Sequence, residues 1–267
     1  MLQQTQVERV IPLFEAFVAR FPDFSSLAAA SKADVLRLWQ GLGYNSRAIR
    51  LLALAQRVVH DYAGQLPSDS QALAALPGIG PYTQAAIRAF AFDLPDLALD
   101  TNLRRILHRV FFGVEFPPQA SSTELEAVAA QMLIAKESNA WNSAMMDLGA
   151  TICTARAPKC LLCPLRADCV AAPIDAQALQ ARAREFAPRR GPQSRMRFED
   201  TVRYLRGRVI DRLRALPAAQ TISFLDLHAD LRPHLGERQP EDVLAVLVAL
   251  EQEGLIAHDE RGIALAE

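Results

Sequence analysis

Hydrophobic residues recur at spacings of three and four through most of the first 152 positions of the chain. Side chains at these spacings lie on one face of an α-helix, so the pattern predicts amphipathic helices. The first such stripe consists of Val7, Ile11, Phe14, Phe17 and Val18. Further helices are expected over residues 81–92, 101–112, 121–135 and 138–152. Because no convincing alternating strand pattern occurs before the C-terminus, the predicted fold class is mainly α.

The periodic pattern is lost over residues 176–198, where Ala, Arg, Pro and Gly predominate. This segment is predicted to be a basic linker with room for a short helix. A compact module is expected over residues 199–267, with helices near 199–215, 224–232 and 240–253. Two apolar runs then flank the polar turn Asp259-Glu260-Arg261-Gly262, which is typical of a β-hairpin. Helices followed by a terminal hairpin predict a winged-helix-like module.

Composition narrows the class of protein. Hydrophobic residues make up 51% of the 267 positions, which permits a large core and excludes a disordered chain. No apolar run approaches the roughly 20 residues of a membrane span. Charges at Glu8, Arg9 and Glu15 interrupt the opening stretch, which therefore lacks the apolar segment of a signal peptide. We expect a soluble, cytoplasmic protein with no membrane partner.

The net charge of −1 conceals two segments of opposite charge. Residues 182–214 contain eleven Arg and four acidic residues, a balance of +7. Residues 215–267 contain three Arg and ten acidic residues, a balance of −7. A basic segment is therefore followed by an acidic module.

All four cysteines lie close together in the sequence, at Cys153, Cys160, Cys163 and Cys169. Thiolates on a tight loop can converge on a metal, whereas disulfides are not expected in a chain without a secretion signal. Zinc ribbons usually present two paired knuckles, and only Cys160 and Cys163 form one here. The spacing alone leaves a structural zinc ion and a 4Fe–4S cluster equally open.

A glycine-rich turn and an aspartate are further candidates for function. The stretch Leu76-Pro77-Gly78-Ile79-Gly80 precedes a predicted helix. Such a turn can expose backbone amides to a phosphate, although taken alone it is more often a plain connection. Asp100 opens another predicted helix, and its simplest role is that of an N-cap. Arg156 and Lys159 follow Cys153 and form either a phosphate-binding pair or a solvated charged loop.

Several motifs together resemble one family over residues 1 to about 172. They are MLQQTQV at Met1–Val7, Gly41-Leu42-Gly43-Tyr44, the LPGIG turn, AMMDLGAT at Ala144–Thr151 and the cysteine spacing. The combination is similar to the MutY family of A/G-specific adenine DNA glycosylases, in the helix-hairpin-helix (endonuclease III) superfamily. The resemblance implies a helix-hairpin-helix glycosylase fold, with a six-helix barrel domain at 1–97 and an iron–sulfur cluster domain at 98–175.

The resemblance also implies a set of site residues. It assigns the catalytic carboxylate to Asp100, with Tyr82 and Asn102 in the same site, and a 4Fe–4S cluster to the four cysteines. A fixed anion would stabilise positive charge on the deoxyribose once the base is flipped out. Tyr82 stands where bifunctional lyases carry a nucleophilic lysine, which implies a monofunctional enzyme. The DNA contacts implied are Gln3, Gln4, Thr5, Tyr44, Leu76, Gly78, Gly80, Arg156 and Lys159, with Tyr44 wedged beside the damaged guanine.

The expected partner is double-stranded DNA with adenine opposite guanine or 8-oxoguanine, bound by a monomer. One alternative is a thymine- or uracil-mismatch glycosylase, although those relatives lack the full Gln-Gln-x-Gln signature. Another is a catalytically impaired lesion-binding protein. The family's proton-donating glutamate lies two residues before the Met of MLQQTQV and has no counterpart in residues 1–267. We therefore expect these residues to bind mismatched DNA and to excise adenine slowly.

Two further departures from the family pattern concern the fold. Asn45 and Thr101 replace the tyrosine and glycine that are commonest in the family. The family's C-terminal domain resembles a Nudix hydrolase and is larger than residues 199–267. The acidity of this module argues against a second DNA-binding surface. Contact with another protein and packing against the core are its expected roles.

Overall fold

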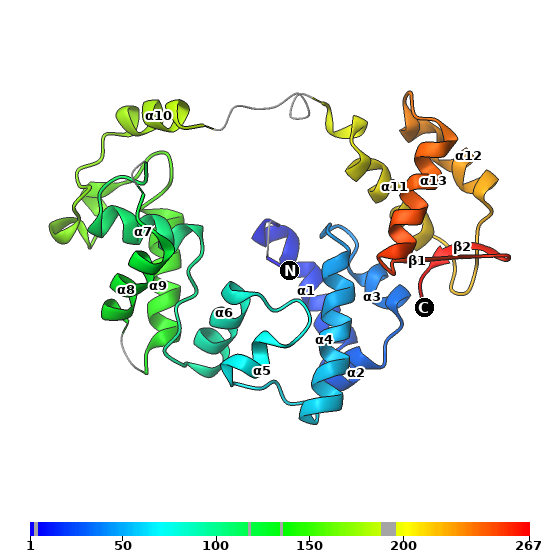
Figure 1. Ribbon diagram of the computed structural model, residues 1–267, viewed down its shortest axis with the longest axis horizontal. Coiled ribbons are helices and arrows are strands. Elements are labelled where there is room, and N and C mark those ends of the chain that lie inside the picture. The colour runs from blue at the N-terminus through cyan, green and yellow to red at the C-terminus, as the bar shows by residue number, and fades with distance from the viewer. Residues whose placement is uncertain (3–4, 117–118, 134–135, 188–195) are drawn as a thin grey trace. The chain divides into compact units, whose positions relative to one another are not determined.

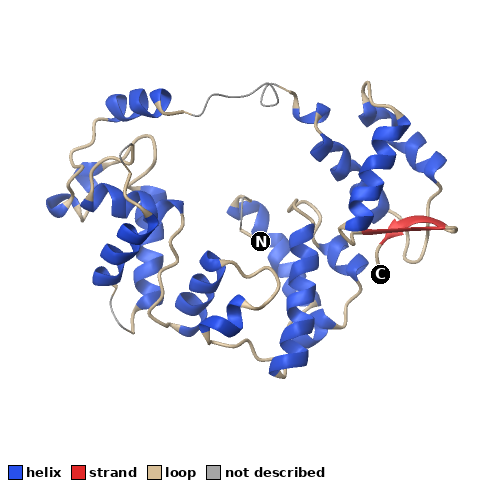
Figure 2. Ribbon diagram, viewed as in Figure 1, coloured by secondary structure: helices blue, strands red, loops and turns tan. Residues whose placement is uncertain are grey.

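The computed structural model describes all residues except 3–4, 117–118, 134–135 and 188–195, and these described residues form two compact units. The first comprises Met1–Pro67, Leu76–Gly78 and the described part of Arg190–Glu267, and the second comprises Ser68–Ala75 and the described part of Ile79–Arg189. Helices dominate both units, as Figure 2 shows, which confirms the mainly α fold class. No helix within the described ranges is long and apolar enough to cross a membrane. The domain boundaries expected at residues 97, 175 and 198 stay predictions.

The N-terminal part of the first unit is a set of helices, drawn in blue in Figure 1. They are α1 (Val7–Arg20), α2 (Phe24–Ala28), α3 (Lys32–Leu38) and α4 (Ser46–Tyr62). The Asp23 side chain caps α2, and Ser31 caps α3 by accepting a hydrogen bond from the Asp34 N–H at 3.1 Å. Helix α4 ends where Ala63 adopts a left-handed φ of 51°. Helices α2 and α4 pack against each other.

The C-terminal part of the first unit has the elements predicted for the module. A short 3-10 helix (Phe198–Asp200) precedes α11 (Val202–Arg214), α12 (Phe224–Leu235), α13 (Pro240–Gln252), β1 (Ile256–Asp259) and β2 (Gly262–Leu265). The two strands pair antiparallel, which confirms the hairpin, and Ile222 adds an isolated bridge to Ile263. Gly262 has a φ of 126°, and a Cβ there would lie 2.8 Å from the Ile222 carbonyl oxygen. The bridge therefore requires glycine at this position.

One hydrophobic core joins this C-terminal module to the N-terminal helices of the first unit. Its buried members include Leu36 of α3 together with Val209 and Leu213 of α11. Beside them the Arg214 side chain is only 6% exposed, and it donates hydrogen bonds to Leu36 O at 2.8 Å and Asn45 Oδ1 at 2.7 Å. The module therefore packs on the core, which is one of the two roles expected for it. Asn45, a departure from the family pattern, is a partner in this contact.

The second unit contains the remaining helices. They are α5 (Ser70–Ala74), α6 (Pro81–Phe92), α7 (Thr101–Phe111), α8 (Ser122–Met132), α9 (Ser138–Thr151) and α10 (Ala176–Glu185). Helix α7 packs against α8 and α9, and α6 packs against α9. Leu103 and Leu107 of α7 share a core with Leu125 of α8 and Leu148 of α9. Helices α6 to α9 confirm the helices predicted between residues 81 and 152, and α10 is the short helix allowed in the linker.

Candidate functional site

Asp100 caps α7, and donors hold both of its carboxylate oxygens. Oδ1 accepts hydrogen bonds from the backbone N–H groups of Asn102 and Leu103 at 2.8 and 2.7 Å. Oδ2 accepts one from the Asn102 side-chain amide at 3.1 Å. The N-cap expected from the sequence is thus confirmed. A carboxylate whose orientation is fixed in this way is a preorganised negative charge.

A chain of hydrogen bonds continues from Asp100 to the cysteine loop. Asn102 Oδ1 accepts a hydrogen bond from Arg105 Nη2 at 2.8 Å. Arg105 also donates to the carbonyl oxygens of Gly149 at 2.7 Å and Cys153 at 2.8 Å. The Arg105 side chain therefore links the residue that orients Asp100 to the backbone of the first cysteine.

Helices α7 and α9 approach closely at Gly149. A Cβ added there would lie 2.6 Å from the Asn102 Cβ, so alanine would force the two helices apart. We expect Gly149→Ala to lower the free energy of unfolding by about 1–3 kcal/mol. Because Asn102 orients Asp100, any reaction that depends on Asp100 should also slow. Urea denaturation followed by circular dichroism measures the first effect.

Gly207→Ala is the matched control for that substitution. Gly207 also lies inside a helix, α11, but a Cβ there would meet no heavy atom within 4 Å. Alanine should therefore raise the free energy of unfolding by up to about 1 kcal/mol through helix propensity alone. Similar destabilisation by both substitutions would contradict the close approach at Gly149.

Tyr82, in the first turn of α6, lies near enough to Asp100 for the two groups to interact electrostatically. Burial of Tyr82 and, to a smaller extent, the charge of Asp100 raise the pKa of its phenol above the ordinary value of 10.0. Tyr82 therefore carries a neutral hydroxyl group at physiological pH, and this group can donate a hydrogen bond. Its side chain remains 41% exposed, so a ligand can reach it.

The loop between α5 and α6 contains three of the expected phosphate contacts. Leu76 is buried and anchors the loop. Gly78 has a φ of 80°, and a Cβ there would lie 3.2 Å from the Arg50 Cβ, so both the backbone and the packing favour glycine. Gly80 is the N-cap of α6, which no side chain caps. The N-terminus of α6 is therefore open to an anion.

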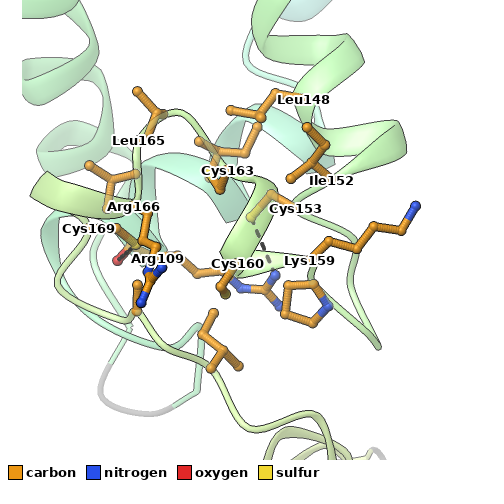
Figure 3. Close-up of a pocket in the computed structure, with 15 residues that line it drawn as sticks. Arg109, Leu148, Ile152, Cys153, Lys159, Cys160, Cys163, Leu165, Arg166 and Cys169 are labelled. Atoms are coloured by element: carbon orange, nitrogen blue, oxygen red, sulfur yellow. Dashed lines mark hydrogen bonds between the residues drawn. The ribbon is translucent and has the colours of Figure 1, made fainter.

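The four cysteines line one cavity among mainly apolar side chains, shown in Figure 3. All four are free thiols. Burial and the charges of the other three cysteines raise the pKa of the Cys163 thiol, although a hydrogen bond with the Leu165 backbone lowers it. The thiols are therefore near one another. Among the described residues, no three His, Cys, Asp or Glu side chains are gathered closely enough to hold a single metal ion.

Arg109 of α7 is fully buried beside this cavity. Its guanidinium group pairs with Glu115, with Nη2–Oε1 and Nε–Oε2 distances of 2.5 and 2.6 Å. It also donates to Thr154 O at 2.8 Å and to Ala155 O at 3.3 Å. A further hydrogen bond to Cys153 Sγ, at 3.5 Å, is the dashed line in Figure 3. Burial alone would lower the pKa of Arg109, but its hydrogen bonds with Glu115 and Cys153 raise it overall. Arg109 thus fixes the backbone after α9 together with one thiol.

Arg156 and Lys159 are exposed in the loop between the first two cysteines. The Lys159 N–H donates to Ile152 O at 2.9 Å, which closes this loop at its base. The exposed Arg166 lines the cysteine cavity and adds a third cation that the sequence pattern did not single out. The loop therefore carries a local positive charge, and contact with phosphates stays a prediction.

Tyr44 stands on a strained turn between α3 and α4. Gly43 has a φ of 68° and Tyr44 itself has a φ of 47°, a left-handed conformation that is unfavourable for tyrosine. The turn is held by hydrogen bonds from Trp39 Nε1 to Gly43 O at 3.1 Å and from Arg47 Nη2 to Leu42 O at 3.1 Å. The Tyr44 side chain is 47% exposed. Strain that presents an exposed aromatic ring is a common feature of binding sites.

The structure gathers the expected site residues into two groups. In the first unit, Thr5 Oγ1 donates to Leu42 O at 3.4 Å and so contacts the turn that carries Tyr44. In the second unit, Tyr82, Asp100 and Asn102 lie together. Gln3 and Gln4 lie outside the described residues.

Sequence reasoning missed Arg105 and Arg109, which tie α7 to the cysteine loop. A signal for Arg109 was present, because it follows Ile106 by three residues and so continues the apolar stripe of α7. A charged residue on a buried helix face normally has a specific partner. No comparable signal identified the partner of Arg105.

Comparison with known proteins gives a family match. The family model described as HhH-GPD superfamily base excision DNA repair protein matches residues 1–131. The adenine DNA glycosylase of Mycolicibacterium smegmatis is 38% identical over 227 residues, which cover 85% of this chain and 73% of that protein. The human adenine DNA glycosylase is 39% identical over 171 residues, which cover 63% of this chain and 31% of that protein.

Solved structures are similar to the chain as well. A thermostable thymine-DNA glycosylase has a TM-score of 0.59 and 29% sequence identity, and the match covers 63% of this chain and 78% of that chain. An endonuclease III trapped in a covalent DNA intermediate has a TM-score of 0.54 and 24% identity, over 62% of this chain and 78% of that chain. These matches agree with the helix-hairpin-helix glycosylase fold expected from the sequence.

Proposed function

This chain belongs to the adenine DNA glycosylase family, within the HhH-GPD superfamily of base excision DNA repair proteins, and we propose that it hydrolyses the N-glycosidic bond of adenine mispaired with guanine or 8-oxoguanine. The observation that carries this proposal is the Asp100 carboxylate, which hydrogen bonds fix in the neighbourhood of Tyr82. The protein acts as a monomer on double-stranded DNA.

Asp100 supplies the electrostatic part of the reaction. The target adenine must first leave the base stack, because its glycosidic bond is inaccessible inside the duplex. As the bond breaks, positive charge develops on the deoxyribose, and the Asp100 carboxylate stabilises it. Asn102 holds the carboxylate in place, and Arg105 holds Asn102. The charge is therefore in position before the reaction begins, which avoids reorganisation during bond breaking.

Tyr82 limits the chemistry to hydrolysis. A lyase reaction needs an amine nucleophile that forms a Schiff base with the sugar, and a phenol cannot form one. The neutral hydroxyl of Tyr82 can instead donate a hydrogen bond to a ligand held near Asp100. The expected product is an abasic site in an unbroken strand.

The DNA contacts are those implied by the resemblance. The open N-terminus of α6 at Gly80 binds a backbone phosphate without reading the base. Tyr44 inserts into the duplex beside the base opposite adenine, and its exposed ring suits this role. Arg156 and Lys159 bind phosphates from the loop between the first two cysteines. Thr5 supports the Tyr44 turn.

The four cysteines would hold a 4Fe–4S cluster. Four free thiols that line one apolar cavity fit a 4Fe–4S cluster, which is bound by four cysteine thiolates. The cluster would supply a structural cross-link that fixes the loop bearing Arg156 and Lys159. Arg109, through its contacts with Cys153 Sγ and the following carbonyl groups, holds this loop from the protein side.

We expect aerobically purified protein to be brown, with broad absorption near roughly 400 nm and about four iron atoms per chain. Iron and zinc are both measured by elemental analysis. Substitution of Cys160 by serine should remove the absorption and most of the iron. Stoichiometric zinc without iron would contradict the assignment.

The proposed reaction is tested with short duplexes that place adenine opposite 8-oxoguanine, guanine or thymine. Single-turnover conditions with long incubation detect slow excision as well as fast excision. We expect free adenine from the first two duplexes and strand cleavage only after alkali treatment. Borohydride trapping of a covalent adduct as efficient as that of a true lyase would contradict the role of Tyr82.

Thymine-mismatch excision is the second candidate, because the thermostable thymine-DNA glycosylase shares the fold at 29% identity. The adenine glycosylases are more similar in sequence, at 38% identity over a larger part of the chain. A duplex with thymine opposite guanine distinguishes the two activities. Release of thymine without release of adenine would favour the second candidate.

A further inference from the structure

A cavity lies in the first unit between the Tyr44 turn and helix α11. It opens to solvent and is also lined by Phe198, Glu253 and Leu255. We propose that this cavity binds a nucleotide of the DNA strand into which Tyr44 inserts, with Arg203 of α11 holding its phosphate. The proposal rests on the function given above, and it places the C-terminal module in the DNA interface.

Arg203 supplies a positive charge that no carboxylate neutralises among the described residues. Its guanidinium carbon lies 5.3 Å from the centroid of the Tyr44 ring, and its side chain is exposed. The other arginines of α11 form ion pairs: Arg206 with Glu253, Arg208 and Arg214 with Asp211, and Arg212 with Asp230. Arg203 is therefore the α11 cation that is available to a phosphate. It lies against the Tyr44 ring, which is expected to enter the duplex.

Gly207 gives independent support for a ligand. Glycine inside a helix is unfavourable relative to alanine. Gly207 lines the cavity, and a Cβ there would meet no heavy atom within 4 Å, so packing does not require glycine. Its φ also lies outside the left-handed region that favours glycine. Because Gly207 has no side chain, a ligand in the cavity can approach the backbone of α11.

The chemistry of the cavity suits a nucleotide. Phe198 and Tyr44 are 56% and 47% exposed, and both line it. Exposed aromatic rings stack on nucleic acid bases. A guanidinium group next to such a ring can bind the phosphate that links two nucleotides. Arg203 and Arg206 outweigh Glu253 among the charged residues of the lining, so the local field attracts an anion.

The acidity of the C-terminal module does not oppose this role. Helix α11 belongs to the basic segment, whereas the acidic excess is carried by residues 215–267, which follow it. The match to the mycobacterial relative, which covers 85% of the chain, is long enough to include α11. The expectation that the module makes no DNA contact was based on its total charge, and the position of α11 beside Tyr44 changes that conclusion.

The test measures binding of a fluorescently labelled duplex with adenine opposite 8-oxoguanine, by anisotropy at several salt concentrations. Arg203→Ala should weaken binding about fivefold at 0.15 M salt and reduce the slope of log affinity against log salt by about 0.9, as expected for one lost phosphate contact. Arg232→Ala is the matched control, because Arg232 is exposed on α12 outside the cavity. It should leave the slope unchanged.

A second variant separates ligand binding from stability. Gly207→Leu places a good helix former where no atom obstructs it, so its melting temperature should equal or exceed that of the unaltered protein. The leucine side chain occupies the part of the cavity next to α11, where Gly207 lines it, so DNA binding should weaken. Normal DNA binding by either variant would overturn the proposal.

Adenine release by the unaltered protein is measured separately. Absence of release, with affinity that still depends on Arg203 and Gly207, would refute the proposed function and leave the nucleotide site standing. Release by an unaltered protein whose affinity is insensitive to both substitutions would refute the nucleotide site alone. Failure of the unaltered protein to bind any duplex would overturn both.

Discussion

Asp100→Asn is expected to reduce the single-turnover rate of adenine release by about 10²–10³-fold, the usual cost of removing one preorganised electrostatic group. Asparagine keeps an oxygen that can accept the hydrogen bonds from the Asn102 and Leu103 amides, so α7 remains capped. The lost property is the negative charge that stabilises the sugar cation in the proposed reaction. Affinity for the duplex should be retained, because the proposed phosphate contacts lie elsewhere. Quenched time courses with protein in excess over DNA measure the rate.

Asp175→Asn is the matched control. Asp175 caps α10 in the same manner, by accepting a hydrogen bond from the Ala178 N–H at 2.7 Å, and it is exposed. Asparagine and aspartate are nearly equivalent as N-caps, so this substitution should change neither stability nor rate. An Asp100→Asn rate close to that of the control would refute the catalytic role of Asp100.

Arg109→Met should lower the free energy of unfolding by about 3 kcal/mol. Methionine retains most of the volume, but it leaves Glu115 and the carbonyl groups of Thr154 and Ala155 without their donor. This expected loss lies at the lower end of the range for removing one partner of a buried ion pair, because Glu115 is 23% exposed and can recover part of its hydration. Iron content should fall as well, since the loop that follows Cys153 loses its anchor. Urea denaturation and elemental analysis on the same preparation measure both effects.

Arg166→Met tests whether the burial of Arg109 causes the expected loss of stability. Arg166 lines the same cavity but is exposed, so its replacement should change the free energy of unfolding by no more than about 0.5 kcal/mol. If the two methionine variants proved equally stable, the ion pair between Arg109 and Glu115 would not be the buried contact described above.

Local signals predicted the parts of the fold that depend on local physics. Helices α6 to α9 follow from apolar periodicity, and the Asp100 cap follows from a residue type that accepts amide hydrogen bonds. The terminal hairpin follows from a polar turn between two apolar runs. Asp100, Tyr82 and the cysteines were identified as candidates because motif resemblance gave these local features a function.

Contacts between distant parts of the chain were not predictable in the same way. Arg105 binds Gly149 O and Cys153 O across more than forty residues, and no periodicity encodes that pairing. Arg203 and Tyr44 are further apart still in sequence, although they lie side by side in the first unit. The net charge of the C-terminal module concealed the basic helix α11, which lies beside the Tyr44 turn. A charge total averages over surfaces, whereas binding depends on the one surface that meets the ligand.

The composition of the first unit has a consequence for synthesis on the ribosome. Its core needs α3 and α11 together, yet α11 to β2 emerge only after the whole second unit has been made. At about 5–20 residues per second, the helices within Met1–Pro67 wait roughly 10–40 s for the last 200 residues. During that time the face of α3 that later contacts α11 is exposed to water. The second unit can therefore fold first, and a nascent chain that stalls before α11 presents this apolar face to chaperones or to other nascent chains.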